Sequence, residues 1–306
     1  MRLAAAVTAV TCCLLLTGCG SSEDEGASAS AGTQTLEGLW RSSGDDVAVV
    51  PGTSDYEPGN VRFSFVVVDS KGRQVLLPSA RIWVASGLEA KPFLMSSAKL
   101  ERIEVPGESE GLSTHIYVAH VRLGKPGTYW LLAEPQGGRE KIHALGNVVV
   151  HESSPVPNVG DPAPSTETPT LTSTRGDLAR LTTRVPPDTQ LLRYSVAGSL
   201  REHVPFVVTF ATPKYCTSRT CGPVVDIVNE VARRFQGQHV RFIHVEVYED
   251  NDPAHGYNRW MKEWGLTTEP WTFLVGKNGR VAARFEGPIS VDELEGAVRA
   301  DLLGGR

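Results

Sequence analysis

The chain has 306 residues, a length that favours two domains over one. It is 41% hydrophobic and 21% charged, which permits ordinary globular cores, and its net charge of −5 at pH 7 excludes the strongly basic balance typical of nucleic-acid-binding proteins. We therefore expect no nucleic-acid partner.

The first residues have the composition of a secretion signal. Arg2 supplies a positive charge, and residues 3–16 form an apolar stretch that is too short to span a bilayer as an ordinary helix. The stretch ends in Leu16-Thr17-Gly18-Cys19, which resembles the bacterial lipobox. The resemblance implies a lipoprotein signal peptide over residues 1–18, cleavage before Cys19, and attachment of acyl chains such as palmitate to the protein at Cys19.

Lipid on Cys19 would anchor the protein at the extracytoplasmic face of the bacterial cell membrane, with the small, polar and acidic residues 19–35 as a flexible tether. The alternative is a plain secretory signal that contains a cysteine by chance. Cys12 and Cys13 are removed with the signal, so Cys216 and Cys221 are expected to remain as thiols in an oxidising compartment.

Residues 36–152 have the pattern of an all-β domain. In the segment 115–123, apolar side chains alternate in the period of two that suits a half-buried strand. We count about seven such strands and no convincing helix, which favours an immunoglobulin-like β-sandwich. Its histidines lack metal-like spacing to carboxylates or thiols, so we expect a binding or spacing role for this domain.

Residues 153–176 are rich in proline, serine and threonine, which predicts a linker between two domains. The remaining residues, 177–306, alternate strand and helix. The run 204–211 is continuously apolar, as expected of a strand buried on both faces. Apolar residues from Val224 to Phe235 then recur at helical spacing, which predicts an amphipathic helix.

Further strands and helices follow: a strand at 240–248, helical spacing from Tyr257 to Trp264, a hairpin at 271–286 and a final capped helix beginning at Ser290. The predicted order is therefore β-α-β-α-β-β-α.

That order, with its residues, resembles the thioredoxin family from about Val204 to Leu303. The resemblance rests on the pair Cys216 and Cys221 at the first strand–helix junction, on the segment WGLTTEPWTFLVGKNGRV, and on the closing amphipathic helix. It implies an α/β thioredoxin-like fold that exchanges disulfides with extracytoplasmic partner proteins and needs no cofactor.

The resemblance also implies residue roles. Cys216 is expected to be the nucleophile, and Cys221 is expected to resolve the mixed disulfide from the first helical turn. Pro270 is expected in the cis form, which would place Glu269 beside the sulfurs. The residues expected to contact the substrate are Tyr215, Glu269 and Trp271.

The expected site has a simple electrostatic basis. A helix N-terminus offers unpaired N–H groups and partial positive charge, which favour a thiolate. Lys214 and Arg219 flank Cys216 and should act in the same direction, whereas an ionised Glu269 would oppose it.

The sequence departs from the family pattern at three points. Four residues separate the cysteines, in CTSRTC, instead of two. Tyr215 stands where tryptophan is common, and Thr209 stands where many members carry a buried aspartate that relays protons. The longer loop leaves reactivity and redox potential open, and with them the direction of exchange.

Other functions remain open. The pair could form an inert structural disulfide, although closing so short a loop stabilises a protein by only about 2 kcal/mol. The protein could be a non-catalytic adhesion or scaffold lipoprotein whose thioredoxin-like domain only binds. Paired thiolates also suit Cu(I), as in copper chaperones that add a distant histidine. Candidates are His239, His244 and His255, but none lies in a sequence resembling that family's histidine loop, and zinc would need more ligands, so we expect no metal site.

Overall fold

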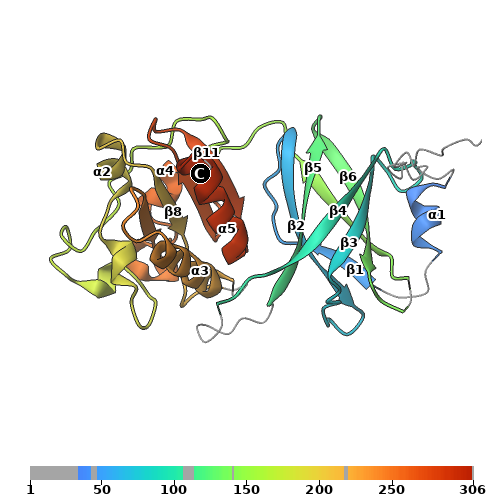
Figure 1. Cartoon of the computed structure of the whole chain (residues 1–306), viewed down its shortest axis with the longest axis horizontal. Coiled ribbons are helices and arrows are strands. Elements are labelled where there is room, and N and C mark those ends of the chain that lie inside the picture. The colour runs from blue at the N-terminus through green and yellow to red at the C-terminus, as the bar shows by residue number, and fades with distance from the viewer. Residues whose placement is uncertain (1–33, 43–46, 106–113, 140, 217–219, 305–306) are drawn as a thin grey trace, which may run out of the picture.

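The computed structural model describes residues 34–42, 47–105, 114–139, 141–216 and 220–304. The predicted signal peptide, Cys19 and nearly all of the predicted tether lie outside the described residues. Within them, no helix is both long and apolar enough to cross a bilayer. The strands form two separate sheets, which lie side by side along the long axis of the molecule (Figure 1).

The first sheet is a closed barrel of seven strands. The strands are β1 (Val47–Pro51), β2 (Gly59–Asp69), β3 (Ser79–Ala85), β4 (Leu94–Arg102), β5 (His115–Leu123), β6 (Gly127–Gln136) and β7 (Ala144–Val150). Around the barrel their order is β1-β2-β5-β4-β3-β6-β7. Neighbours are antiparallel except β1 and β7, which are parallel and close the ring at Ala48 and Leu145.

The number of strands agrees with the sequence analysis, but the immunoglobulin-like sandwich is not confirmed. A sandwich consists of two separate sheets, whereas here β3 pairs with β4 and β1 pairs with β7, so one sheet closes on itself. The period of two in the sequence specifies which side chains are buried and does not specify which strands pair. A short helix that the sequence analysis did not predict, α1 (Leu36–Trp40), precedes the barrel, and the Thr35 hydroxyl caps it by accepting the Gly38 N–H.

Aromatic side chains fill the middle of the barrel. Phe63 and Phe65 are two residues apart on β2, so they lie on the same face, and their ring centroids are 4.9 Å apart. Phe65 in turn stacks on Tyr117 of β5 at 5.3 Å. The Tyr117 hydroxyl donates a hydrogen bond to the Leu77 carbonyl, so this buried polar group is satisfied.

The second sheet has four strands in the order β11-β10-β8-β9. They are β8 (Phe206–Phe210), β9 (Arg241–Val245), β10 (Trp271–Val275) and β11 (Val281–Glu286). β8 and β9 are parallel, and the two other pairs are antiparallel. The accompanying helices are α2 (Val196–Arg201), α3 (Cys221–Arg234), α4 (Arg259–Glu263) and α5 (Val291–Ala297), and α5 continues into a wider π-helical turn at Val298–Leu302. From β8 onward the order agrees with the predicted β-α-β-α-β-β-α.

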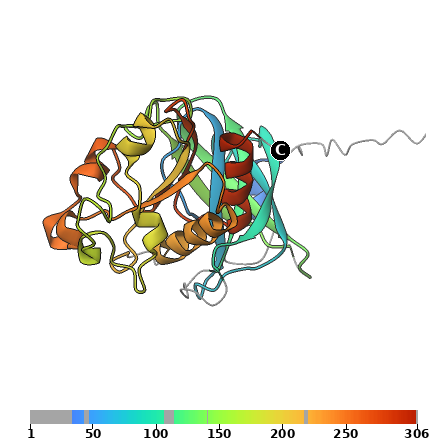
Figure 2. The same ribbon diagram turned by 60° about the vertical axis from the view of Figure 1, so that its left-hand side comes forward.

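Both faces of this sheet are covered, which explains why β8 is apolar at every position but one. On one face, Val207 and Leu274 pack against α3 and α5. On the other, Phe206, Val208 and Phe210 pack against α2, α4 and the residues that follow α4. Figures 1 and 2 show α3 and α5 together on the same side of the sheet.

The proline-rich segment 153–176 is packed against the second sheet. Gly160 N–H donates to the Val281 carbonyl, and Ala163 N–H donates to the Gly279 carbonyl, so the segment runs along β11. Further on, the Thr166 hydroxyl accepts the indole N–H of buried Trp264 at 3.1 Å. The segment runs between the two sheets in the chain, and its contacts make it a structured component of the second.

Charged side chains join the barrel to the second sheet. Arg62 of β2 forms a two-pronged ion pair with Glu293 of α5, at 2.5 and 2.8 Å, and both side chains are largely buried. Arg284 of β11 pairs with Asp55, in the loop after β1, at 3.1 Å. These contacts place α5 and β11 against β2 of the barrel, an arrangement visible in Figure 2.

The same loop after β1 approaches the second sheet more closely still. The backbone N–H groups of Ser54 and Asp55 donate to the Glu286 carboxylate, each at 2.7 Å. Next to it, Gly287 has φ +74°, and a Cβ atom there would lie 2.3 Å from the Gly52 carbonyl oxygen. Only glycine fits this backbone contact.

Candidate active site

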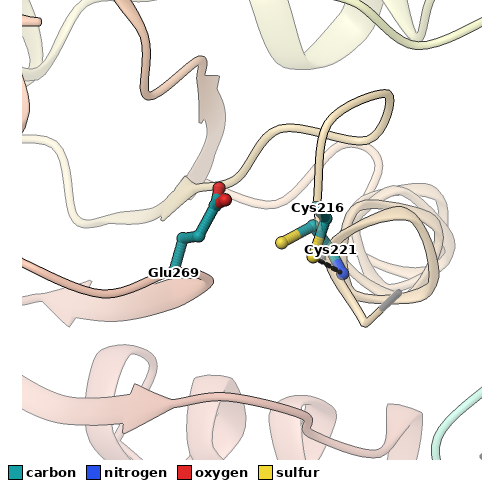
Figure 3. A group of neighbouring side chains, drawn as sticks. All are labelled: Cys216, Cys221 and Glu269. Carbon is teal, nitrogen blue, oxygen red and sulfur yellow. Dashed lines mark hydrogen bonds between the residues drawn. The ribbon is translucent and has the colours of Figure 1, made fainter. Parts of the chain in front are cut away.

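The two cysteines meet at the N-terminus of α3. Cys221 is the first residue of this helix, and its backbone N–H donates to the Cys216 Sγ at 3.3 Å. A helix N-terminus therefore points one of its unpaired N–H groups at the sulfur of Cys216. Cys216 is partly exposed, whereas Cys221 is completely buried. Both are thiols here, and Figure 3 shows them side by side at the end of the helix.

The environment of Cys221 strongly favours its protonated form. A hydrogen bond with Cys216, burial, and the negative charge of Glu269 together raise the pKa of the Cys221 thiol far above its ordinary value. The backbone N–H of Thr212 acts in the opposite direction. The exposed cysteine is thus suited to attack, while the buried one needs help to lose its proton.

Glu269 completes the cluster from a different element. It lies two residues before β10, its peptide bond to Pro270 is cis, and its side chain points toward the cysteines (Figure 3). One carboxylate oxygen of Glu269 and the Sγ atoms of Cys216 and Cys221 all lie within 4.8 Å of one another. Among the described residues, no other group of three or more His, Cys, Asp or Glu side chains gathers so closely.

The carboxyl of Glu269 is unusually weak as an acid. Burial, the negative charge of Cys216 and that of Glu246 raise its pKa to about 7, against a hydrogen bond with Tyr248 that lowers it. That hydrogen bond runs from the Tyr248 hydroxyl to Oε1 at 3.4 Å. Oε2 is buried and has no hydrogen-bond partner within the described part of the chain.

Three tyrosines form a wall beside the cluster. Tyr215 packs edge-on against Tyr248, with ring centroids 6.5 Å apart, and Tyr248 stacks on Tyr257 at 5.5 Å. All three are partly exposed. Burial and the Glu269 charge raise the pKa of Tyr248 to about 12, so it is a hydrogen-bond donor at neutral pH. The sequence predicts Tyr215 as a site residue but does not predict that role for Tyr248 or Tyr257.

A second buried carboxylate, Glu246, also escaped the sequence analysis. It directly follows β9, and its Oε1 accepts hydrogen bonds from the backbone N–H and the hydroxyl of Thr183, at 2.5 and 2.8 Å. Its position was a usable signal: β8 and β9 are parallel, so their carboxyl ends meet at the edge where the cysteine loop begins, and ligands commonly bind at such an edge.

Two predicted site residues lie differently from expectation. Trp271 is 2% exposed, stacks on Phe273 and donates its indole N–H to the Thr268 hydroxyl, so its side chain belongs to the core and is not available to a substrate. The Lys214 ammonium lies over the Tyr215 ring, 4.9 Å from its centroid. Arg219 lies outside the described residues.

The remaining candidates have structural explanations. Thr209 is buried, and its hydroxyl bonds to the Trp271 carbonyl and to Thr272, so no carboxyl occupies its position. His244 is buried and bonded to the Ala211 carbonyl, which agrees with its interpretation as a packed core histidine. Within the described residues, no histidine belongs to the cysteine cluster.

Comparison with known proteins leaves the family open. No protein-family model and no curated protein matches the sequence. Among solved structures, a thioredoxin-family thiol:disulfide interchange protein from Chlorobium tepidum TLS is similar, with 18% identity and a TM-score of 0.30 over 46% of this chain and 94% of that one. The PKD domain of the human VPS10 domain-containing receptor SorCS2 is similar over 36% of this chain and 75% of its own, with 15% identity and a TM-score of 0.20. These scores are low, so the chemistry must be judged from the site itself.

Proposed function

We propose that the protein is a thiol–disulfide oxidoreductase, anchored through Cys19 at the extracytoplasmic face of the bacterial membrane, that exchanges disulfides with partner proteins through Cys216 and Cys221. One observation carries the proposal: Cys216 is partly exposed, and its Sγ accepts the first N–H of α3 while lying next to the buried thiol of Cys221. An accessible sulfur facing a helix N-terminus, with a second sulfur behind it, is what attack followed by resolution requires.

The surroundings supply a place for a partner. Tyr215, Tyr248 and Glu269 line the approach to the sulfurs, offering aromatic surface and a hydrogen-bonding edge. In the proposed reaction, Cys216 attacks a partner disulfide, and Cys221 then displaces the partner from the mixed disulfide. The lipid anchor rests on the resemblance of residues 16–19 to the lipobox.

Trapping tests the order of events. With the full chain, Cys221→Ser should accumulate a mixed disulfide with a partner or a model disulfide peptide, because the resolving thiol is missing. Cys216→Ser should accumulate none. If neither variant traps a partner and neither changes thiol reactivity, the proposed mechanism is wrong.

Redox titration separates exchange from the other functions. A reversible dithiol couple with a potential well above about −300 mV supports exchange, and a bond that resists reduction in the folded protein supports a structural disulfide. Stoichiometric Cu(I) held by the reduced protein and lost in Cys216→Ser would support a copper carrier instead. The measured potential also decides whether the protein acts as a reductase or an oxidase.

A further inference from the structure

The buried position of Cys221 creates a chemical problem for the proposed function. A thiolate is the attacking species in disulfide exchange. In the mixed disulfide, Cys216 no longer carries the charge that hydrogen-bonds with Cys221, but burial and the nearby Glu269 carboxylate still hold the pKa of Cys221 above its ordinary value. Resolution by Cys221 therefore needs a base within reach of its sulfur. Thr209 cannot serve, because a hydroxyl is too weak a base to deprotonate a thiol, and this one is bonded to Trp271 and Thr272.

Several ionisable groups face this sulfur or its neighbours: Cys216, Glu269, Tyr248, Tyr257, Glu246 and, at the rim, Lys214. Only Glu269 combines a basic oxygen with a position within 4.8 Å of both sulfurs. Its Oε1 is engaged by Tyr248, while its buried Oε2 has no hydrogen-bond partner among the described residues. The distance of at most 4.8 Å between a Glu269 oxygen and the Cys221 Sγ lets a proton pass directly after a small movement or through one water molecule.

We propose that Glu269 accepts the proton of the Cys221 thiol as Cys221 resolves the mixed disulfide held on Cys216. The inference rests on the proposed function and adds a proton acceptor to it. As the Glu269 carboxylate takes the proton, the Cys221 sulfur attacks the Cys216 sulfur and breaks its bond to the partner. The Cys216–Cys221 disulfide forms, the partner disulfide has been reduced by two electrons, and the second partner sulfur leaves as a thiolate. Protonated Glu269 then returns its proton to that thiolate or to solvent.

The charges in the site favour the ionised form of Glu269 at the step in which Cys221 must lose its proton. The negative charge of Cys216 is one of the causes that raise the pKa of Glu269 to about 7. When Cys216 becomes part of a mixed disulfide, that charge disappears, so Glu269 ionises more readily. The base is therefore formed at the stage at which Cys221 must be deprotonated. A base with a pKa near the working pH is also the most effective one.

A chromogenic aromatic disulfide resolves the two steps. The reduced mature lipoprotein, in which Cys216 and Cys221 are the remaining thiols, should release thionitrobenzoate twice from 5,5′-dithiobis(2-nitrobenzoate), first when Cys216 attacks and again when Cys221 resolves. Stopped-flow absorbance from pH 5 to 9 gives both rates. Cys221→Ser should show only the first release, which assigns the phases.

Glu269→Gln should slow the second release by about 100-fold at pH 7, at the lower end of the range for general bases. Its rate should also rise with hydroxide across the whole pH range, while the first release stays equal or becomes faster. Glu269→Asp should restore part of the second rate. Glu246→Gln is the matched control: it removes a neighbouring charge that raises the Glu269 pKa, so it should shift the midpoint of the second release to lower pH without abolishing it.

The direction in which Glu269→Gln changes the rate of the second release distinguishes proton transfer from simple electrostatics. Removing a negative charge beside Cys221 would by itself ease its ionisation and speed the second release. A second release that is unchanged or faster in Glu269→Gln would therefore overturn the role of Glu269 while leaving exchange by Cys216 intact. Absence of the first release from the unaltered protein would overturn the proposed function and this inference together.

Discussion

In the barrel, the buried side chains are mostly apolar, and the titratable exceptions, Glu134 and His143, are separate from the interior cluster and lie 3.7 Å from each other. In the second sheet, by contrast, Cys221, His244, Glu246 and Thr209 are buried around the carboxyl ends of β8 and β9. Buried polar groups cost free energy unless they are paired, and groups with perturbed pKa values concentrate at functional sites. The difference points to chemistry in one part and a supporting role for the other.

Hydrogen bonds connect the barrel to the segment that precedes Glu269. Glu286 accepts hydrogen bonds from Ser54 and Asp55 of the barrel loop and from the Thr268 hydroxyl. Thr268 immediately precedes Glu269, so the barrel is hydrogen-bonded, through one carboxylate, to the segment that carries the proposed proton acceptor. Four experiments test this division of roles.

The largest effect is expected at the nucleophile. Cys216→Ser should lower the rate of disulfide exchange by at least about 1,000-fold, because a serine hydroxyl cannot replace a thiolate. Val50→Ser, at an exposed position of the barrel, is the control and should leave the rate unchanged. Stopped-flow exchange with a disulfide peptide measures both. A comparable loss in the barrel variant would refute the division of roles.

The next effect concerns stability and pH. Because the pKa of Glu269 is raised to about 7 in the folded state and is near 4.5 in the unfolded chain, the folded protein binds more protons between these values. Stability should therefore fall as pH rises through this window. Glu269→Gln should remove that loss and stabilise the protein at pH 8 by on the order of 2 kcal/mol, because each pKa unit corresponds to about 1.4 kcal/mol and solvent screening at this partly exposed carboxyl reduces the full value.

Urea unfolding at pH 4 and pH 8 tests this prediction. Glu263→Gln removes an exposed carboxyl from α4 and should show no such difference. Equal stabilisation by Glu269→Gln at both pH values would mean that the carboxyl is not held in its protonated form by the fold.

A smaller effect is expected where the two parts touch. Gly287→Ala forces a Cβ atom to within 2.3 Å of the Gly52 carbonyl oxygen, at a φ of +74°. We expect a loss of about 1–3 kcal/mol in the free energy of unfolding. Gly296→Ala, on α5 with open space around the added carbon, should instead stabilise by about 0.5–1 kcal/mol. Thermal and urea unfolding measure both, and equal stability of the two variants would show that the contact with Gly52 contributes nothing.

The smallest effect is expected at Lys214. Sequence proximity suggested that its charge favours the Cys216 thiolate, but the ammonium lies over the Tyr215 ring in an exposed position. Exposed charges interact weakly in water, so Lys214→Ala should change the alkylation rate of Cys216 by iodoacetamide less than about twofold. Lys277→Ala, in the distant hairpin, is the control. A large drop for Lys214→Ala alone would restore the interpretation based on sequence.

Much of the second sheet followed from local pattern. The continuous apolar run of β8 and the spacing of Val224, Ile227, Val228 and Val231 in α3 predict their own structures, because burial on two faces or on one stripe leaves a periodic trace. The position of the cysteine pair could also be predicted from the sequence, because Cys216 and Cys221 lie between the predicted strand and the predicted helix. In the barrel, the alternation of buried and exposed residues predicted the strands as well.

Tertiary structure alone decided which further groups, Tyr248, Tyr257 and Glu246, join the site and how the barrel closes. Glu269 lies 48 residues after Cys221, and its place beside the sulfurs was expected only from the family resemblance, because nothing in the spacing indicates that its carboxylate comes within 4.8 Å of that sulfur. Trp271 was expected to contact a substrate, but its side chain is buried on the face of the sheet that α2 and α4 cover. Periodicity records whether a side chain is buried, whereas strand pairing and the approach of distant loops depend on packing between elements, which leaves no local trace.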